Sequence, residues 1–313
     1  PAVVIWPDYR AIFLACLGWP LIRCILSHTT SQRPYRLSMN PTLVGKLLKF
    51  SWPLMLSGLL LFLVFHGDRA VVGHYFSMHE LGFFSLVLTA FLLPSQLLHK
   101  VYDSLFLSSL SKAFRHRDRF ESQQFLIWHS LFALSTAYVL FSILLGPWLF
   151  IFLFGEKYEP GLDLLPWIVL MVSVRILRIA TSMLALATAK PYCELYANLV
   201  RASALPIAII GLAMGYPIEC VPIAGIIGEV LALFVGLVSL NLPVSHAVKP
   251  PAVSGMIMLW LASMVFITAE IVIDINPPYV SATLAAVLLI TMILFFIKQY
   301  PKFTIERGFQ NDV

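Results

Sequence analysis

Residues 47–91 read LLKFSWPLMLSGLLLFLVFHGDRAVVGHYFSMHELGFFSLVLTAF, in which two long apolar runs flank the polar segment HGDR. A helix needs roughly 20 mostly apolar residues to cross a hydrocarbon core of about 30 Å, and each run approaches that length. Asp68 and Arg69 stand side by side between the runs, where a membrane makes ionised groups expensive. The stretch therefore predicts two membrane-spanning helices with a charged pair between them.

The composition of the whole chain agrees with a membrane protein. Hydrophobic residues make up 59% of the 313 residues and charged residues 12%, and the mean hydropathy is +0.87. A soluble domain of this size could not cover so much apolar surface. The net charge of +5 comes from short basic clusters between apolar runs, which is typical of cytoplasmic loops and excludes a nucleic-acid partner.

The apolar runs predict an all-α, polytopic membrane helix bundle of about nine transmembrane helices, because the runs lack the short alternating strands of a barrel. Boundaries are set by charges, proline or glycine. The expected spans are residues 4–26, 43–66, 80–107, 123–150, 163–188, 193–214, 218–240, 252–273 and 279–298.

Lysine and arginine set the expected orientation, because they are enriched in cytoplasmic loops. Most of the 21 basic residues fall in the connections 23–49, 108–122, 189–192 and 241–251 and in the C-terminal tail. These segments are therefore expected in the cytoplasm, with a cytoplasmic C-terminus. Nine spans would then place Pro1 outside, as expected for a chain cut after an odd number of helices.

Two stretches carry a resemblance to a known family. The pattern of residues 47–91 combines a basic entry turn, the early Pro53, the Asp68–Arg69 pair and an exterior turn ending in Leu81 and Gly82. A second stretch, FLFGEKYEPGLDLLPWIVL at 152–170, contains a Gly-x-x-Tyr turn. Together they resemble polysaccharide flippases, of the O-antigen type, in the multidrug/oligosaccharidyl-lipid/polysaccharide exporter superfamily.

The resemblance implies a domain organisation and a function. Residues 1–41 would be the last helix of a truncated first lobe with its linker, 42–245 a six-helix second lobe, and 246–313 a terminal helix pair and tail. The family moves undecaprenyl-diphosphate-linked oligosaccharide across the bacterial cytoplasmic (inner) membrane for surface polysaccharides such as lipopolysaccharide. Expected partners are this lipid-linked oligosaccharide, the phospholipid bilayer and polysaccharide polymerase components.

Arg175 and Arg178 lie about halfway along the fifth expected span, and their i, i+3 spacing puts them on one helical face. Each arginine at a helix centre costs about 2.5–3.5 kcal/mol, so a lipid-facing pair is excluded. Two interpretations remain. Either Glu229 or Asp103 neutralises the arginines, or they line a water-filled cavity and bind a diphosphate, whose oxygens suit paired guanidinium groups.

Asp68 and Arg69 point about 100° apart on a helix, so each needs a partner other than its neighbour. Near the exterior end of its span, Arg69 could snorkel to the interface while Asp68 turns inward. One interpretation is structural, with the pair fixing the helix end and its turn. The other is gating or cation coupling, with His66 or His74 nearby.

Three further charged positions are candidates for gating or coupling. Lys100 and Asp103 are spaced for an intrahelical i, i+3 ion pair, or they line the cytoplasmic mouth of a cavity. Glu229 lies mid-span between helix-contacting glycines, Gly225 and Gly228, where it either pairs with an arginine or titrates. By contrast, Glu194 and Arg201 read as ordinary charges near helix ends and suggest no function.

The sequence contains no nucleotide-phosphate loop, nucleophile elbow, paired catalytic acids or metal-ligand spacing. No enzyme activity, cofactor or metal is therefore expected. Two alternative functions remain open: a cation-coupled drug exporter of the same fold, which should favour acidic cavity residues, and a membrane-embedded glycosyl or acyl transferase or polymerase. The latter usually needs a large exterior loop or an intramembrane His/Asp site, and the expected exterior turns are short.

Overall fold

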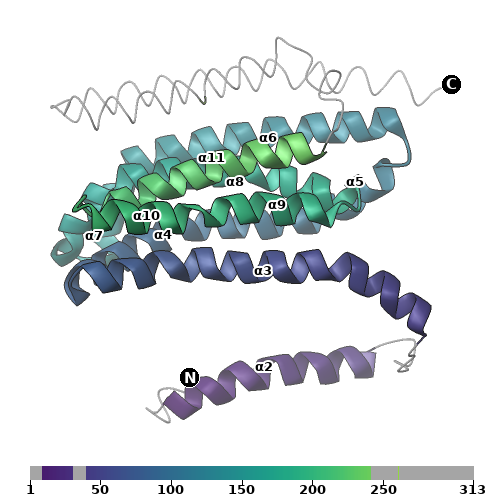
Figure 1. Ribbon diagram of the computed structural model, residues 1–313, viewed down its shortest axis with the longest axis horizontal. Coiled ribbons are helices and arrows are strands. Elements are labelled where there is room, and N and C mark those ends of the chain that lie inside the picture. The colour runs from purple at the N-terminus through teal and green to yellow at the C-terminus, as the bar shows by residue number, and fades with distance from the viewer. Residues whose placement is uncertain (1–8, 31–39, 241–259, 261–313) are drawn as a thin grey trace. The chain divides into compact units, whose positions relative to one another are not determined.

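A computed structural model describes residues 9–30, 40–240 and 260 of the chain. Every regular element in these residues is helical (Figure 1), which confirms the all-α class. The chain forms two compact units, Pro1–Leu48 and Lys49–Val313. The helices are α2 (Tyr9–Thr30), α3 (Pro41–Tyr75), α4 (Met78–Tyr102), α5 (Ser108–Ala113), α6 (Arg117–Leu144), α7 (Gly146–Phe154), α8 (Leu165–Ala187), α9 (Pro191–Ala202), α10 (Ala204–Ala213) and α11 (Cys220–Leu240).

Six helical segments of the described chain are long and apolar enough to cross a membrane, and they correspond to the second to seventh expected spans. They are Pro41–Tyr75, Met78–Ala113, Asp118–Leu144, Glu156–Ala187, Pro191–Ala213 and Cys220–Leu240. The first expected span overlaps α2. The last two, at 252–273 and 279–298, lie outside the described residues apart from Trp260. A polytopic membrane helix bundle is thus confirmed.

The expected end of the second span at residue 66 is wrong, because α3 continues through Asp68 and Arg69 to Tyr75. One polar turn does not interrupt the backbone hydrogen bonds of a helix when apolar residues resume after it. The chain turns instead at Ser77, whose hydroxyl accepts from the Glu80 backbone N–H while the Glu80 carboxylate accepts from Ser77. This capping box starts α4.

Two of the spans contain irregular turns. The third passes from α4 through a π-helical turn, η1 (Asp103–Leu107), into α5. The fifth begins with a 3₁₀ segment, η2 (Glu156–Leu164), before α8. A π turn holds one residue more than an α turn, so it rotates the faces of the helix on either side relative to each other.

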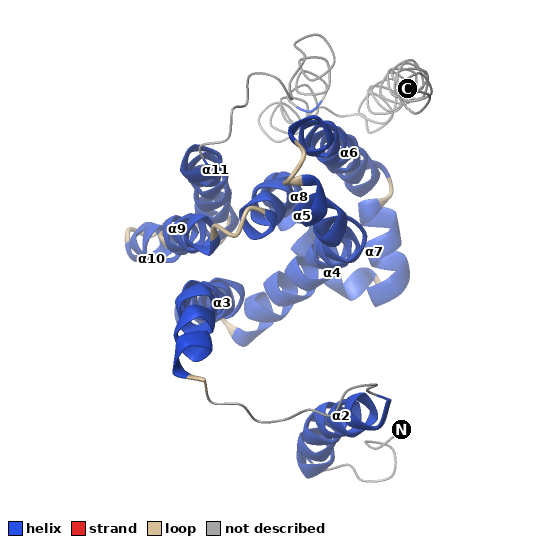
Figure 2. Ribbon diagram, turned by 90° about the vertical axis from the view of Figure 1, so that its right-hand side faces the viewer, coloured by secondary structure: helices blue, strands red, loops and turns tan. Residues whose placement is uncertain are grey.

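Helix α8 is at the centre of the second unit (Figure 2), where it contacts α4, α6, α9 and α11. Its side chains are buried along almost its whole length, including those of Ser173, Arg178 and Thr181. The arginines of α8 therefore face other helices and not lipid.

Glycines allow α11 to approach its neighbours closely, as the sequence predicted for Gly225 and Gly228. A Cβ atom on Gly228 would lie 2.9 Å from the Arg201 carbonyl oxygen of α9. One on Gly225 would lie 2.5 Å from Sδ of Met171 on α8. Small residues permit such close contacts between membrane helices, and here they bring Glu229 between α8 and α9.

Candidate functional site

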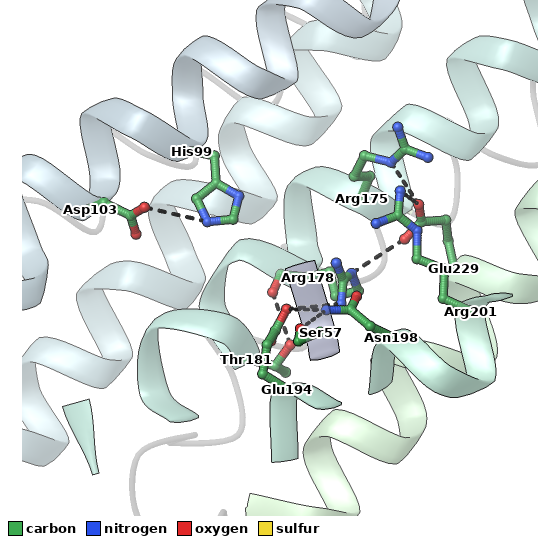
Figure 3. Close-up of polar contacts among 10 residues, drawn as sticks. All are labelled: Ser57, His99, Asp103, Arg175, Arg178, Thr181, Glu194, Asn198, Arg201 and Glu229. Atoms are coloured by element: carbon green, nitrogen blue, oxygen red, sulfur yellow. Dashed lines mark hydrogen bonds and ion pairs between the residues drawn. The ribbon is translucent and has the colours of Figure 1, made fainter. Parts of the chain in front are cut away.

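Five charged side chains from three helices meet in the interior of the second unit (Figure 3). We call them the charge cluster: Arg175 and Arg178 of α8, Glu194 and Arg201 of α9, and Glu229 of α11. None is more than about a tenth exposed, which excludes solvent or lipid as their main partner.

Glu229 is the centre of the charge cluster, with its side chain 1% exposed. Its Oε1 accepts from Arg175 Nε at 2.6 Å and lies 2.7 Å from Arg201 Nη2. Its Oε2 lies 3.3 Å from Arg178 Nε. Three guanidinium groups therefore share one carboxylate. Of the two acids that the sequence offered as neutralising partners, the structure selects Glu229.

Helix α9 contributes the charges whose role the sequence analysis missed. Glu194, Asn198 and Arg201 follow an i, i+4, i+7 pattern, so they lie on one face of α9. Glu194 Oε1 lies 3.5 Å from Arg178 Nη1, and the Asn198 amide donates to Glu194 Oε1 at 3.0 Å. This periodicity was visible in the sequence, but it was read as chemistry of the helix ends.

The charge cluster holds more hydrogen-bond donors than acceptors. A guanidinium carries about five N–H donors and a carboxylate accepts about four hydrogen bonds, so two carboxylates cannot satisfy three arginines. Arg175 Nη1 and Arg201 Nε are buried without a hydrogen-bond partner among the described residues. Each such atom costs roughly 1–3 kcal/mol. An added group rich in acceptor oxygens would satisfy them.

Two adjacent cavities border the charge cluster and share Phe65, Gln96 and Arg175. The smaller, of about 90 Å³, lies on the cluster and is lined by Leu61, Phe65, Ser95, Gln96, His99, Arg175, Arg178, Ile179, Glu194 and Arg201. The larger, of about 190 Å³, is lined by Phe65, His66, Asp68, Arg69, Leu88, Leu92, Gln96 and Arg175. Both are bounded by α3, α4 and α8, and Arg175 belongs to both.

The ring of Phe65 on α3 forms an aromatic wall against two arginines. The guanidinium carbons of Arg175 and Arg201 lie 5.1 and 5.2 Å from its centroid. Cations within about 6 Å of an aromatic face are attracted to it. Phe65 thus helps to hold both guanidinium groups where α3 meets the charge cluster.

Asp68 and Arg69 lie within α3 and differ in their surroundings. Arg69 Nη2 donates to Thr89 Oγ1 of α4 at 2.7 Å. Asp68 does turn inward and lines the larger cavity, where its carboxylate accepts no hydrogen bond from another described side chain. Because the helix continues to Tyr75, neither residue is at the turn that the structural interpretation assigned to them.

The expected contact between Lys100 and Asp103 is wrong. Asp103 lies 3.5 Å from His99 Nε2, one helical turn earlier, whereas Lys100 is exposed and forms no ion pair with Asp103. The local i, i+3 rule assumes a continuous α-helix, but a π turn begins at Asp103. Asp103 is also not a partner of the cluster arginines. Of this stretch, His99 reaches the smaller cavity.

A comparison with models of protein families assigns part of the chain. Residues 1–163 match a family model described as polysaccharide biosynthesis protein, which is more than half of the chain. No curated protein and no solved structure matches the chain. The matched region includes α3 and α4, which form one wall of both cavities, and it ends just before α8.

Proposed function

The chain belongs to the polysaccharide biosynthesis protein family, and from that premise we propose that it flips a diphosphate-linked oligosaccharide lipid across a membrane. The substrate class is undecaprenyl-diphosphate-linked oligosaccharide, and the membrane is the bacterial cytoplasmic (inner) membrane with the C-terminus in the cytoplasm. The product would supply cell-surface polysaccharide such as lipopolysaccharide. Polysaccharide polymerase components would take it up on the far side.

The donor surplus of the charge cluster carries this proposal. Diphosphate oxygens are acceptors that match guanidinium forks, and Arg175 borders both cavities between α3, α4 and α8. A cluster with three cations and two anions keeps one excess positive charge inside membrane-spanning helices. A protein maintains such a charge in a membrane mainly where it serves a substrate or ion pathway.

The proposed mechanism is alternating access without covalent chemistry. The diphosphate would occupy the basic cavity, the glycan would follow it through the interior, and the polyprenyl tail would stay in the bilayer. Movement of helices around a fixed central site is the general mode of such transporters. We therefore propose a transporter and not an enzyme, with residues that bind and release but do not react.

The two alternative functions differ in the cavity they require. A cation-coupled drug exporter should present unpaired acids, and Asp68 is such an acid in the larger cavity. Arg69 and Arg175 line the same cavity, however, which favours an anionic substrate. A membrane-embedded transferase or polymerase would need a reactive group beside the diphosphate. The described lining includes Ser95, His99 and Glu194 in the smaller cavity and His66 and Asp68 in the larger, so this alternative is distinguished by its product, a modified or lengthened glycan.

Translocation in proteoliposomes tests the proposal. The full-length protein is reconstituted with a fluorescent polyprenyl-diphosphate oligosaccharide, and glycan on the outer leaflet is measured by its accessibility to a soluble glycosidase. Transfer above that of protein-free vesicles, reduced in Arg175→Ala at equal protein density, is expected. Equal rates with and without protein would refute the proposed activity.

A further inference from the structure

The three arginines of the charge cluster are not equivalent. Arg201 and Arg178 are 2% and 6% exposed, and Arg178 contacts both carboxylates. Arg175 is the most exposed at 11%, borders both cavities and contacts Glu229 through Nε, while its Nη1 has no hydrogen-bond partner among the described residues. Arg175 is therefore the arginine whose release from the cluster breaks the fewest contacts.

Glu229 keeps two arginine partners when its contact with Arg175 is broken. Its Oε1 also lies 2.7 Å from Arg201 Nη2, and its Oε2 lies 3.3 Å from Arg178 Nε. Two guanidinium groups then still neutralise the buried carboxylate. A buried charge is strongly unfavourable only when it is left unpaired, so release of Arg175 does not strand Glu229.

We propose that Glu229 is an exchangeable counterion, which forms an ion pair with Arg175 until a diphosphate replaces it. This inference rests on the proposed function and assigns the order of contacts in its site. With the cavity empty, the Glu229 carboxylate imitates a phosphoryl oxygen at Arg175 Nε. When the diphosphate enters, Arg175 turns to it and gains acceptors for Nη1, while Arg201 and Arg178 retain Glu229. Substrate binding thereby removes one of the ion pairs between α8 and α11.

Competition for one arginine predicts the sign of a mutational effect. If Glu229 competes with diphosphate, Glu229→Gln frees Arg175 and tightens diphosphate binding, by at least about fivefold for a typical coupling between sites. If Glu229 instead only holds Arg175 in place, the same variant weakens binding. The two accounts predict opposite changes in the dissociation constant.

Glu194→Gln is the matched control, because it removes the same charge from the same cluster. Glu194 contacts Arg178 and Asn198 but not Arg175. A general electrostatic effect would tighten binding in both variants to the same extent. Exchange at Arg175 predicts a larger gain for Glu229→Gln, and it predicts that this gain disappears when Arg175→Gln is added.

The experiment titrates the purified full-length protein and its variants in nanodiscs with inorganic pyrophosphate and with farnesyl diphosphate, by isothermal calorimetry. Tighter binding of both probes to Glu229→Gln than to Glu194→Gln, lost in the Arg175→Gln background, is expected. Weaker or unchanged binding in Glu229→Gln, or equal gains in the two Glu variants, overturns the proposal. Translocation is measured separately, so intact translocation with no gain in Glu229→Gln refutes the exchange alone.

A second measurement on the wild-type chain covers a Glu229 variant that does not fold. In ¹⁵N-arginine-labelled protein, the Nε–H resonance that disappears in Arg175→Lys is assigned to Arg175. Pyrophosphate should shift this resonance while the Nε–H of Arg178, assigned in the same way, stays near its position. A shift of Arg178 with no change at Arg175 would overturn the exchange.

Discussion

Asn198 on α9 donates a hydrogen bond to the hydroxyl oxygen of Ser57 on α3 at 2.6 Å, across 141 residues of sequence. Asn198 also donates to Glu194 of the charge cluster. The pair therefore connects α3, which forms one wall of both cavities, to the helix that supplies Glu194 and Arg201.

Ser57→Ala should loosen this connection. Side-chain hydrogen bonds between membrane helices contribute roughly 0.5–2 kcal/mol, so a loss of stability in that range is expected in thermal unfolding of the detergent-purified protein. Ser95→Ala is the control, because Ser95 is equally buried at 3% but bonds Leu92 O within its own helix. Equal losses in the two variants would show that the contact between α3 and α9 contributes nothing specific.

Gly228→Ala should destabilise the packing of α11 on α9. The added methyl would lie 2.8 Å from Ala204 Cβ and 2.9 Å from the Arg201 carbonyl oxygen, and backbone cannot yield as a flexible side chain can. Overpacking of this kind costs about 1–3 kcal/mol. Gly58→Ala meets no atom within 4 Å and should be neutral or stabilising. The melting temperatures of the two variants give the comparison, and an unchanged value for Gly228→Ala would contradict it.

Substitutions of Arg175 and Arg201 should affect different quantities: export for Arg175 and the amount of folded protein for Arg201. Arg201→Ala truncates a side chain that is 2% exposed and lies against the Phe65 ring, and the cavity left by truncating a large buried side chain costs about 2–5 kcal/mol, so less folded protein should reach the membrane. Arg175→Ala leaves Glu229 with two partners and should reduce glycan-lipid export at normal abundance. Arg175→Lys should restore export only in part, because an ammonium lacks the bidentate fork. Export per amount of folded protein is the measured quantity, and normal export in Arg175→Ala would exclude Arg175 from the mechanism.

Asp68→Asn should impair transport without loss of stability. Its carboxylate accepts no hydrogen bond from a described side chain and faces the larger cavity, so an amide of nearly the same shape loses no contact and should not lower the free energy of unfolding. Glu80→Ala is the contrasting variant, because the Glu80 carboxylate accepts from the Ser77 N–H in the capping box of α4, and losing one hydrogen bond costs about 0.5–1.5 kcal/mol. Transport is compared in vesicles with and without a proton or sodium gradient. If Asp68→Asn lowers stability but leaves transport normal, the role of Asp68 is structural.

Single-cysteine labelling checks the predicted orientation. In a background without the native cysteines, a cysteine at Arg115, in the turn between α5 and α6, should react only from the cytoplasm. A cysteine at Glu159, in η2, should react from outside. Both positions are exposed in the structure. External labelling at 115 together with protection at 159 would reverse the orientation derived from the basic loops.

The sequence was sufficient for features that depend on local pattern. Apolar length predicted the spans, and the i, i+3 spacing placed Arg175 and Arg178 on one face. The roles of Arg201 and Glu194 were missed, because they depend on α9 packing against α11 at Gly228. The predicted ion pair between Lys100 and Asp103 failed for a different reason. The spacing rule assumes α-helical geometry, and the residue types alone do not reveal the π turn at Asp103.

The order in which the charges occur along the chain constrains biosynthesis. Synthesis runs from the N-terminus, so Arg175 and Arg178 emerge before Glu194 and well before Glu229. When α8 first meets the translocon, its two arginines have neither of the carboxylates that contact them in the finished protein. Inserting them alone would cost about 5–7 kcal/mol. Helix α8 therefore depends on downstream helices for a favourable place in the bilayer. A nascent chain truncated before Glu229 should leave α8 poorly integrated, although α8 itself is complete.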